Sequence, residues 1–330
     1  GNFPIINNKE GIKQYGWRLV KGMLQLKTAI HQFFKSKNQD ITLAEFINHN
    51  QIEEVFWHGA VMPVLYTICT CDPKTIGEWP AKPLLVFLRQ LTDGDALLRL
   101  HGGTAAFVDK LIEGIDIHSD SRITLVEQRG EHVHVENAQG EQFEFDRVVV
   151  ATPTNKIESF LNNEQFADDI ALLKQFKFEQ GELVMHTDAT VMPPKRKEWA
   201  VLSYMMDRNF TRQQFTVWLN AIEPTLVGKS PVFQTWRPVT AIEPKKIISS
   251  VTLTRAVVDS VTVELNHQLQ QRHQATDRKV FYCGSWSCDG LPILESAVTS
   301  AMYIAEIFDA PIPFKGLKPK VEVAPELGYA

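Results

Sequence analysis

The sequence predicts a mixed α/β fold in which helices come first and strands dominate the later part. Apolar residues recur at helical spacing over 15–91, and period-two alternation begins near residue 123. A short apolar strand at 279–283 then ends in Gly284, and a small-residue helix opens at Glu295. A strand, a tight turn and a helix N-terminus together attract anionic ligands, because free N–H groups and the positive end of the helix dipole meet there.

Composition is that of an ordinary globular chain. The 330 residues are 44% hydrophobic and 22% charged, which suffices for one large core or two linked cores. The net charge of −5 argues against a nucleic-acid partner, and no apolar run approaches the roughly 20 residues of a membrane span. No secretory signal is found. We therefore expect a cytoplasmic protein with a small-molecule substrate, and a homo-oligomer is compatible with the sequence.

The four cysteines are expected to be thiols. They form two close pairs, Cys69 with Cys71 and Cys283 with Cys288. A zinc site would need two C-x₂-C-like clips, and the spacings C-x-C and C-x₄-C fit poorly. We predict neither a metal site nor a disulfide framework.

The first predicted helix, 15–36, is amphipathic and basic. Its apolar residues near a 3.6 period are Trp17, Val20, Leu24, Ile30 and Phe34, and its other face carries Arg18, Lys21, Lys27 and Lys35. A solvated domain helix is the preferred interpretation, and contact with a membrane surface is the alternative.

The helical pattern continues beyond this segment. Thr42 begins a second helix, with Glu45 in the capping-box position. Residues 51–69 are strongly apolar and helical in pattern, although Pro63 must kink or break them. A further short helix covers 84–91.

The pattern changes at Leu98. Gly102 and Gly103 form a turn that leads into a helix ending near Ile112, although these glycines could also form no more than a turn. The prolines within 180–240 break strand-like runs and indicate an antiparallel sheet. The predicted strands are 115–118, 123–128, 132–136, 143–151, 183–187, 215–220, 247–253 and 279–283, with a hairpin turn at 137–140 and a helix at 156–161.

The order of several segments carries a family resemblance. They are the 102–111 turn and helix, 146–153, 184–188 with 192–193, 217–220, 281–286 and 292–298. Together they resemble the flavin-containing amine oxidase superfamily, which includes monoamine and polyamine oxidases and phytoene-type desaturases. More narrowly, the chain is similar to its bacterial branch of predicted FAD-dependent oxidoreductases, also described as NAD/FAD-binding proteins. The resemblance covers roughly residues 15–310.

The resemblance implies a Rossmann-like FAD-binding domain, incomplete at its N-terminus, and a substrate domain of antiparallel sheet and helices. The implied bounds are 1–97 and 156–274 for the substrate domain, 98–155 and 275–310 for the FAD-binding domain, and 311–330 for a tail. The G-x-G-x-x-G unit that opens this family's sequences is not found in the chain. We therefore expect the C-terminal portion of a longer enzyme, which alone binds FAD poorly.

The resemblance also implies which residues bind the cofactor, FAD. They are Val126, Ala151, Thr152, Pro153, Gly284, Ser285, Trp286, Glu295, Ser296 and Ala297. Val126 would meet adenine through its backbone, 151–153 would line the adenosine and pyrophosphate, and Gly284 and Ser285 would admit the ribityl–phosphate chain. Residues 295–297 would place N–H groups at the flavin pyrimidine edge. Trp286 is either a core aromatic or faces the flavin ring.

Two positions bear on the substrate. Amine oxidases place an aromatic residue two positions before the helix-opening Glu, and here that position is Ile293. An aliphatic wall has no ring quadrupole for a cationic amine and favours an apolar substrate. Trp218 is the second predicted pocket residue. The implied activity is hydride transfer from an apolar or amine substrate to flavin N5, with no assignable acid–base residue. The alternative is a non-catalytic binding or assembly module that keeps the scaffold without the cofactor.

Two further clusters allow two interpretations each. His186 and Asp188 share one face of a strand, either as a catalytic pair or as polar residues on a half-solvated strand. Residues 195–197, Lys-Arg-Lys, form either a solvated loop or a docking patch for an anionic partner.

Overall fold

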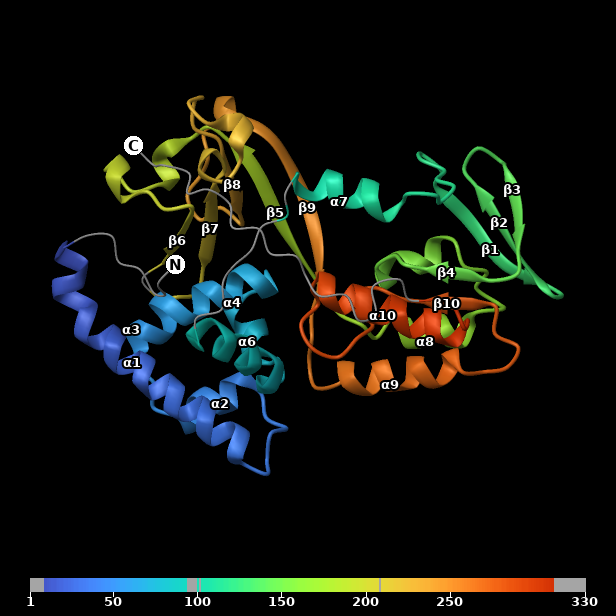
Figure 1. Ribbon diagram of the computed structural model, residues 1–330, viewed down its shortest axis with the longest axis horizontal. Helices are drawn as coiled ribbons and strands as arrows, with labels where there is room; N and C mark the ends of the chain where they lie inside the picture. Colours follow the sequence, from blue (N-terminus) through green and yellow to red (C-terminus); the bar gives the residue numbers. More distant parts are fainter. Residues whose placement is uncertain (1–8, 94–99, 101, 208, 312–330) are drawn as a thin grey trace.

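The computed structural model describes residues 9–93, 100, 102–207 and 209–311 (Figure 1). These residues form two parts, each around its own large hydrophobic core. One part joins the N-terminal helices to a five-stranded antiparallel sheet, and the other surrounds a parallel strand pair with helices. The predicted fold class, with a Rossmann-like part and a part of helices and antiparallel sheet, is confirmed.

The N-terminal helices pack around the larger core, to which Leu26, Phe46 and Trp79 contribute fully buried side chains. The predicted capping box of the second helix is confirmed, because Thr42 and Glu45 satisfy each other's backbone N–H groups through their side chains. The helices are α1 (Lys9–Lys35), α2 (Leu43–His49), α3 (Glu54–Phe56), α4 (Met62–Cys69), α5 (Pro73–Gly77) and α6 (Ala81–Asp93).

Pro63 shapes the connection between α3 and α4. Proline lacks an N–H group and crowds the carbonyl four residues earlier, so a regular helix cannot pass through it. The chain forms a π-helical turn over Trp57–Val61 just before this proline. The predicted break is therefore a widened turn within a continuing helix.

The prediction of which face of α1 is buried was wrong in part. Trp17, Val20 and Leu24 are 76%, 51% and 60% exposed. They lie opposite the buried face, which carries Leu26, Ala29, Ile30 and Phe33. Because α1 has apolar residues on both faces, periodicity alone could not distinguish the face that meets α3 from the face that meets solvent.

The antiparallel sheet has the strand order β6-β7-β8-β5-β9. Phe215 and Trp236 belong to the helix-facing core, whereas Phe233 and Trp218 pack on the other face. β5 and β9 extend from this sheet toward the second part (Figure 1). The strands are β5 (Phe178–His186), β6 (Leu202–Met206), β7 (Gln213–Trp218), β8 (Phe233–Trp236) and β9 (Ile247–Ala256).

The second part is built on the parallel pair β4 (Val148–Val150) and β10 (Val280–Tyr282). Side chains of β10 alternate between two helical layers. Val280 and Tyr282 share a core with α8 (Ala167–Leu173) and α9 (Thr262–His273), and Phe281 packs with α10 (Leu294–Ile307). Helices on both faces of parallel strands make this part Rossmann-like.

An antiparallel meander lies beside the parallel pair. It consists of β1 (Ile123–Arg129), β2 (His132–Asn137) and β3 (Gln142–Phe145), and α7 (Gly103–Leu111) precedes it. The predicted hairpin turn and the helix after Gly102 are confirmed.

Two local predictions were wrong, and a third was right only in part. Residues 115–118 form no strand. The predicted single strand 143–151 is two strands in different sheets, because the chain leaves the meander after Phe145 and joins β10 at Val148. The segment predicted as a helix at 156–161 is a 3₁₀ helix over Thr154–Ser159. The split of 143–151 depends on which distant strand lies alongside, so local pattern does not decide it.

Buried side chains of α8 and α9 lie in one core with those of β4 and β10. Both helices fall within 156–274, the segment that the resemblance assigns to the substrate domain, and the domain bounds stay a prediction. Apart from Pro311, the predicted tail lies outside the described residues, as do residues 1–8.

Within the described ranges, none of the helices combines the length and apolar character needed to cross a membrane.

The approach of α1 to α3 gives a test of this packing. A methyl group on Gly22 would lie 2.2 Å from the Phe56 Cβ atom. We expect Gly22→Ala to lower the free energy of unfolding by about 1–3 kcal/mol, because the two helices must separate. Gly59→Ala is the matched control, since nothing lies within 4 Å of its added Cβ. Urea unfolding measures both variants, and an unchanged midpoint for Gly22→Ala would contradict the prediction.

Candidate functional site

The turn after β10 is shaped by Gly284. Its φ of +150° is a backbone conformation that side chains rarely adopt, and an added Cβ would lie 2.6 Å from the Trp286 Nε1 atom. The Gly284 N–H donates to the Ser300 hydroxyl at 3.0 Å, which fastens the turn to α10. Only glycine therefore fits between the end of β10 and the indole of Trp286.

Trp286 connects two segments that the sequence placed at one site. Its indole N–H donates to the Thr152 carbonyl at 3.2 Å, and its ring packs edge-on against Phe176 at 4.9 Å. The side chain is buried in the smaller core. Of the two interpretations of Trp286, the structure supports the core aromatic, and the contact brings residues 151–153 beside Gly284 and Ser285.

The N-terminus of α10 presents free donors. Among the described residues no side chain caps it, and the first helical hydrogen bond runs from the Ala297 N–H to the Ile293 carbonyl at 3.2 Å. The N–H groups of residues 294–296 precede that bond, so they are the unsatisfied donors of the helix. The Ser296 hydroxyl donates to the Leu291 carbonyl and is not available as a cap.

Apolar side chains flank these donors. Ile293 and Leu294 are 39% and 59% exposed. A flavin, the cofactor that the resemblance implies, needs donors at its pyrimidine edge and an apolar wall beside its ring. The start of α10 offers both, so the residues present fit this part of the cofactor.

The loop after β4 forms the other side of this region. Ala151, Thr152 and Pro153 are exposed, and the next residue, Thr154, is buried. The Thr154 hydroxyl has no hydrogen-bond partner among the described residues. An orphaned hydroxyl beside an exposed loop suits a segment that contacts a polar ligand.

Val126 does not fit the role that the resemblance implied. Its N–H donates to the Phe160 carbonyl at 2.6 Å, and its carbonyl accepts the Asn162 N–H at 2.9 Å. Its side chain is buried in the smaller core. The N–H is therefore already used, and only the second lone pair of the carbonyl is left for adenine.

Trp218 is separated from the other predicted residues. It lies on the sheet face opposite Phe215, where its ring packs against Trp199 at 5.3 Å. The Arg196 guanidinium lies over both indoles, 4.4 Å from Trp199 and 4.8 Å from Trp218. The structure thus does not bring Trp218 close to Ile293. Arg196, the central residue of 195–197, makes a cation–π contact with both indole rings.

His186 and Asp188 are buried rather than half-solvated. The His186 Nε2 atom lies 2.8 Å from the Thr235 hydroxyl, and its Nδ1 accepts the Asp188 N–H at 3.1 Å. Asp188 accepts hydrogen bonds from the Thr190 and Glu243 N–H groups and from Lys246 Nζ, which hold the pKa of its carboxyl at about 2 despite burial. Because every polar atom of the imidazole ring is used, the pair serves structure and offers no free base.

A second buried carboxylate, which no sequence pattern indicated, fixes β10. Asp169 of α8 accepts hydrogen bonds from Arg272 at 3.0 Å, from Arg278 at 2.5 Å and from the Tyr282 hydroxyl at 3.0 Å. Burial raises the pKa of Asp169, but the two guanidinium groups more than offset this and lower it. These partners are about 100 residues apart along the chain, so only the folded topology brings them together.

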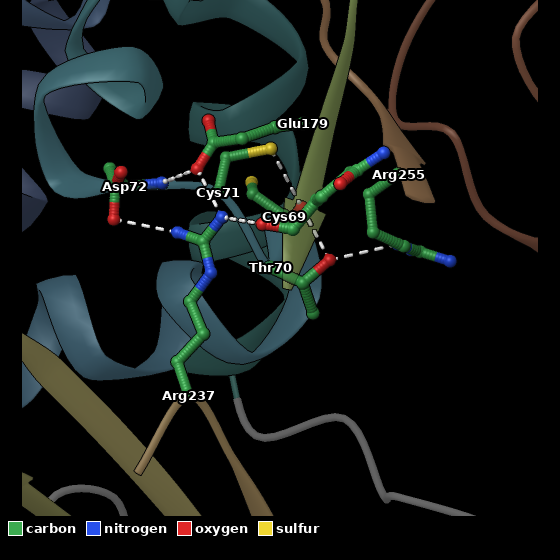
Figure 2. A network of polar contacts seen from close by, with 8 residues as sticks. Cys69, Thr70, Cys71, Asp72, Glu179, Arg237 and Arg255 are labelled. Atoms are coloured by element: carbon green, nitrogen blue, oxygen red, sulfur yellow. Dashed lines mark hydrogen bonds and ion pairs between the residues drawn. The ribbon is translucent and has the colours of Figure 1, made fainter. Parts of the chain in front are cut away.

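A polar cluster lies where α4 and α5 meet the sheet (Figure 2). Arg237 pairs with Asp72 and Glu179, each at 2.6 Å, and Arg255 donates to the Thr70 hydroxyl at 2.8 Å. Burial raises the pKa of the neighbouring Cys71 thiol to about 12, so it stays protonated. Over the described ranges, no three His, Cys, Asp or Glu side chains gather to hold a metal ion.

A hollow of about 310 Å³ opens beside this cluster, between helices and sheet. Its wall includes Tyr66 from α4 and Gln213 from β7. Gln213 is 4% exposed, and its amide nitrogen and oxygen both lack hydrogen-bond partners among the described residues. Tyr66 belongs to the same apolar cluster as Leu291, which precedes α10. The hollow therefore lies between the N-terminal helices and the antiparallel sheet.

Comparison with known proteins identifies a matching family and structures of similar fold. The family model of flavin-containing amine oxidoreductases matches residues 17–187, and no curated protein matches the chain. A CLA-producing fatty acid isomerase from P. acnes shares 15% identity and a TM-score of 0.58, over 92% of this chain and 77% of the isomerase. An oxidoreductase from Methanosarcina mazei shares 11% identity and a TM-score of 0.60, over 87% and 72%. At these identities the two structures show a common fold.

His273 makes the stability of the site region depend on pH. Its Nε2 accepts the Tyr282 N–H at 3.1 Å, and burial lowers its pKa to about 3. Since an unfolded histidine titrates near 6.5, the unfolded chain takes up the proton first as pH falls. The stabilisation that neutral His273 gives the folded chain is complete above about pH 6.5. As the pH falls toward 3, the free energy of unfolding decreases by at most about 1.4 kcal/mol per pH unit.

We expect His273→Gln, which offers a non-titrating acceptor, to flatten the dependence of unfolding free energy on pH between about 6.5 and 4. The exposed His31→Gln is the control and should keep the wild-type slope. Urea unfolding at several pH values measures both, and an unaltered slope in His273→Gln would refute the assignment.

Proposed function

Because the chain belongs to the flavin-containing amine oxidoreductase family, we propose that it is an FAD-dependent oxidoreductase. The reaction is hydride transfer to flavin N5 from an apolar or amine substrate, and the apolar class is favoured. The observation that carries the proposal is the start of α10, where uncapped N–H groups lie beside exposed aliphatic side chains.

The protein would hold the cofactor at both strand ends. Residues 151–153 after β4 and Gly284 after β10 would approach its adenosine and phosphate portion, joined to each other through Trp286. The N–H groups of residues 294–296 would donate to the pyrimidine edge. When bound, FAD supplies the hydride acceptor at N5. The helix dipole and these donors would stabilise the negative charge that develops at N1 and O2.

Two features support an apolar substrate with one polar group. Ile293 and Leu294 offer an aliphatic wall and no aromatic ring for a cationic amine. The buried Gln213 amide offers one donor face and one acceptor face to a hydroxyl, carbonyl or carboxyl group. One structure of similar fold is a fatty acid isomerase, and a fatty acid is also a largely apolar chain with a polar end.

The substitution Ile293→Asp tests the proposed flavin edge. Ile293 occupies the N-cap position, so an aspartate there would accept the free N–H groups of α10 and place negative charge at the same point. We expect the free energy of unfolding to stay equal or to rise by about 1 kcal/mol, while FAD affinity falls at least about tenfold. Fluorescence titration of FAD with the full-length natural protein measures affinity, and urea unfolding measures stability.

Ile293→Val is the matched control and should bind FAD as the unchanged chain does. Equal FAD affinity for Ile293→Asp would show that the start of α10 does not meet the cofactor. A full-length natural protein that gains no flavin absorbance from FAD would instead favour the binding or assembly module without cofactor.

A further inference from the structure

The outward face of α1 carries an apolar stripe that the fold leaves uncovered. Trp17, Val20 and Leu24 lie along one side of the helix, opposite Leu26 and Phe33 of the core. Trp17 is the most exposed of them, at 76%. α1 lies at the outer edge of the helical part, away from α10 (Figure 1). An aromatic and two aliphatic side chains in a row on a solvent-facing surface point to a partner.

The charge around this stripe is strongly positive. The helix contains Lys9, Lys13, Arg18, Lys21, Lys27 and Lys35 but only one acidic residue, Glu10. Arg18 is paired with Glu53. Lys13, Lys21, Lys27 and Lys35 are exposed and form no ion pair with any part of the chain that the structure describes. The chain as a whole carries −5, so this surface is locally opposite in sign to the rest.

We propose that α1 docks flat on an anionic lipid surface, with the stripe at the depth of the headgroups and the lysines around it. Tryptophan favours the bilayer interface, and lysine stems can lie along apolar surface while their ammonium groups reach lipid phosphates. Lysine is depleted in protein–protein interfaces, which argues for a lipid partner over a protein. The stripe covers only residues 17–24, so contact is shallow and reversible.

A hollow beside the stripe adds room for a lipid group. It measures about 320 Å³, borders the stripe at Leu24 and is also lined by Ile52. Gln25 and Asn50 line it as well. This surface is separate from the start of α10, so docking would leave the candidate flavin site uncovered.

Co-sedimentation with lipid vesicles tests the proposal. The chain should pellet with phosphatidylcholine vesicles that contain phosphatidylglycerol, and not with phosphatidylcholine alone. Trp17→Ser with Leu24→Ser, and separately Lys21→Glu with Lys27→Glu, should each weaken binding at least about tenfold. Raising the salt concentration should weaken binding as well, because salt screens the lysine charges.

Val227→Ser removes an equally exposed aliphatic side chain elsewhere and should bind as the unchanged chain does. All these positions are exposed, and unchanged urea midpoints would show that the variants fold. The proposal fails if no vesicle binding occurs, or if Val227→Ser weakens it as much as the stripe variants do. It also fails if the chain is a dimer by light scattering that Trp17→Ser with Leu24→Ser makes monomeric, because the stripe would then join two copies.

Discussion

The geometry of the candidate site depends on the contact of the Trp286 indole with Gly284 and Thr152. The indole occupies space that any side chain at position 284 would fill, and its N–H reaches the Thr152 carbonyl across 134 residues of sequence. This contact ties the carboxyl end of β4 to that of β10, and Ser300 ties the same turn to α10. Because Trp286 is buried in the core, the strand ends and the helix start are fixed relative to one another before any ligand arrives.

Sequence patterns correctly predicted the elements whose form depends on neighbouring residues. The Thr42–Glu45 capping box, the hairpin turn after β2 and the strand, turn and helix from Val280 onward all follow from neighbouring residues. What failed depends on distant partners. The division of 143–151 between two sheets requires β10 to lie beside Val148, and the exposed face of α1 is defined by α3 packing on Gly22. For the candidate site, the resemblance indicated the loop after β4 and the start of α10, but the hydrogen bonds that occupy Val126 come from residues 160–162.

The buried polar residues hold the fold together and are not free to act on a substrate. His186 and Asp188 have the residue types of a catalytic pair, yet their polar atoms are consumed by Thr235, Thr190 and Lys246. Asp169 is likewise saturated by two arginines and a tyrosine. A group whose hydrogen bonds are all made inside the protein has none left for a substrate. Residue type and proximity alone therefore do not show a catalytic role. These networks hold β5 and α8 in place.

Unsatisfied groups are the more informative sign, and two sets of them lie at the start of α10 and in the Gln213 hollow. The N-terminus of α2 has a capping box, whereas no described side chain caps the N-terminus of α10. An Asp or Ser at the N-cap of α10 would stabilise this helix by about 1 kcal/mol. It also buries Gln213 with neither amide atom paired to a described residue, at an expected cost of about 1–3 kcal/mol. Leu291 lies in one apolar cluster with Tyr66, which lines the Gln213 hollow, and Leu291 leads directly into α10. Stability given up at two points joined by one cluster is what a bound cofactor and its substrate would restore by accepting those hydrogen bonds.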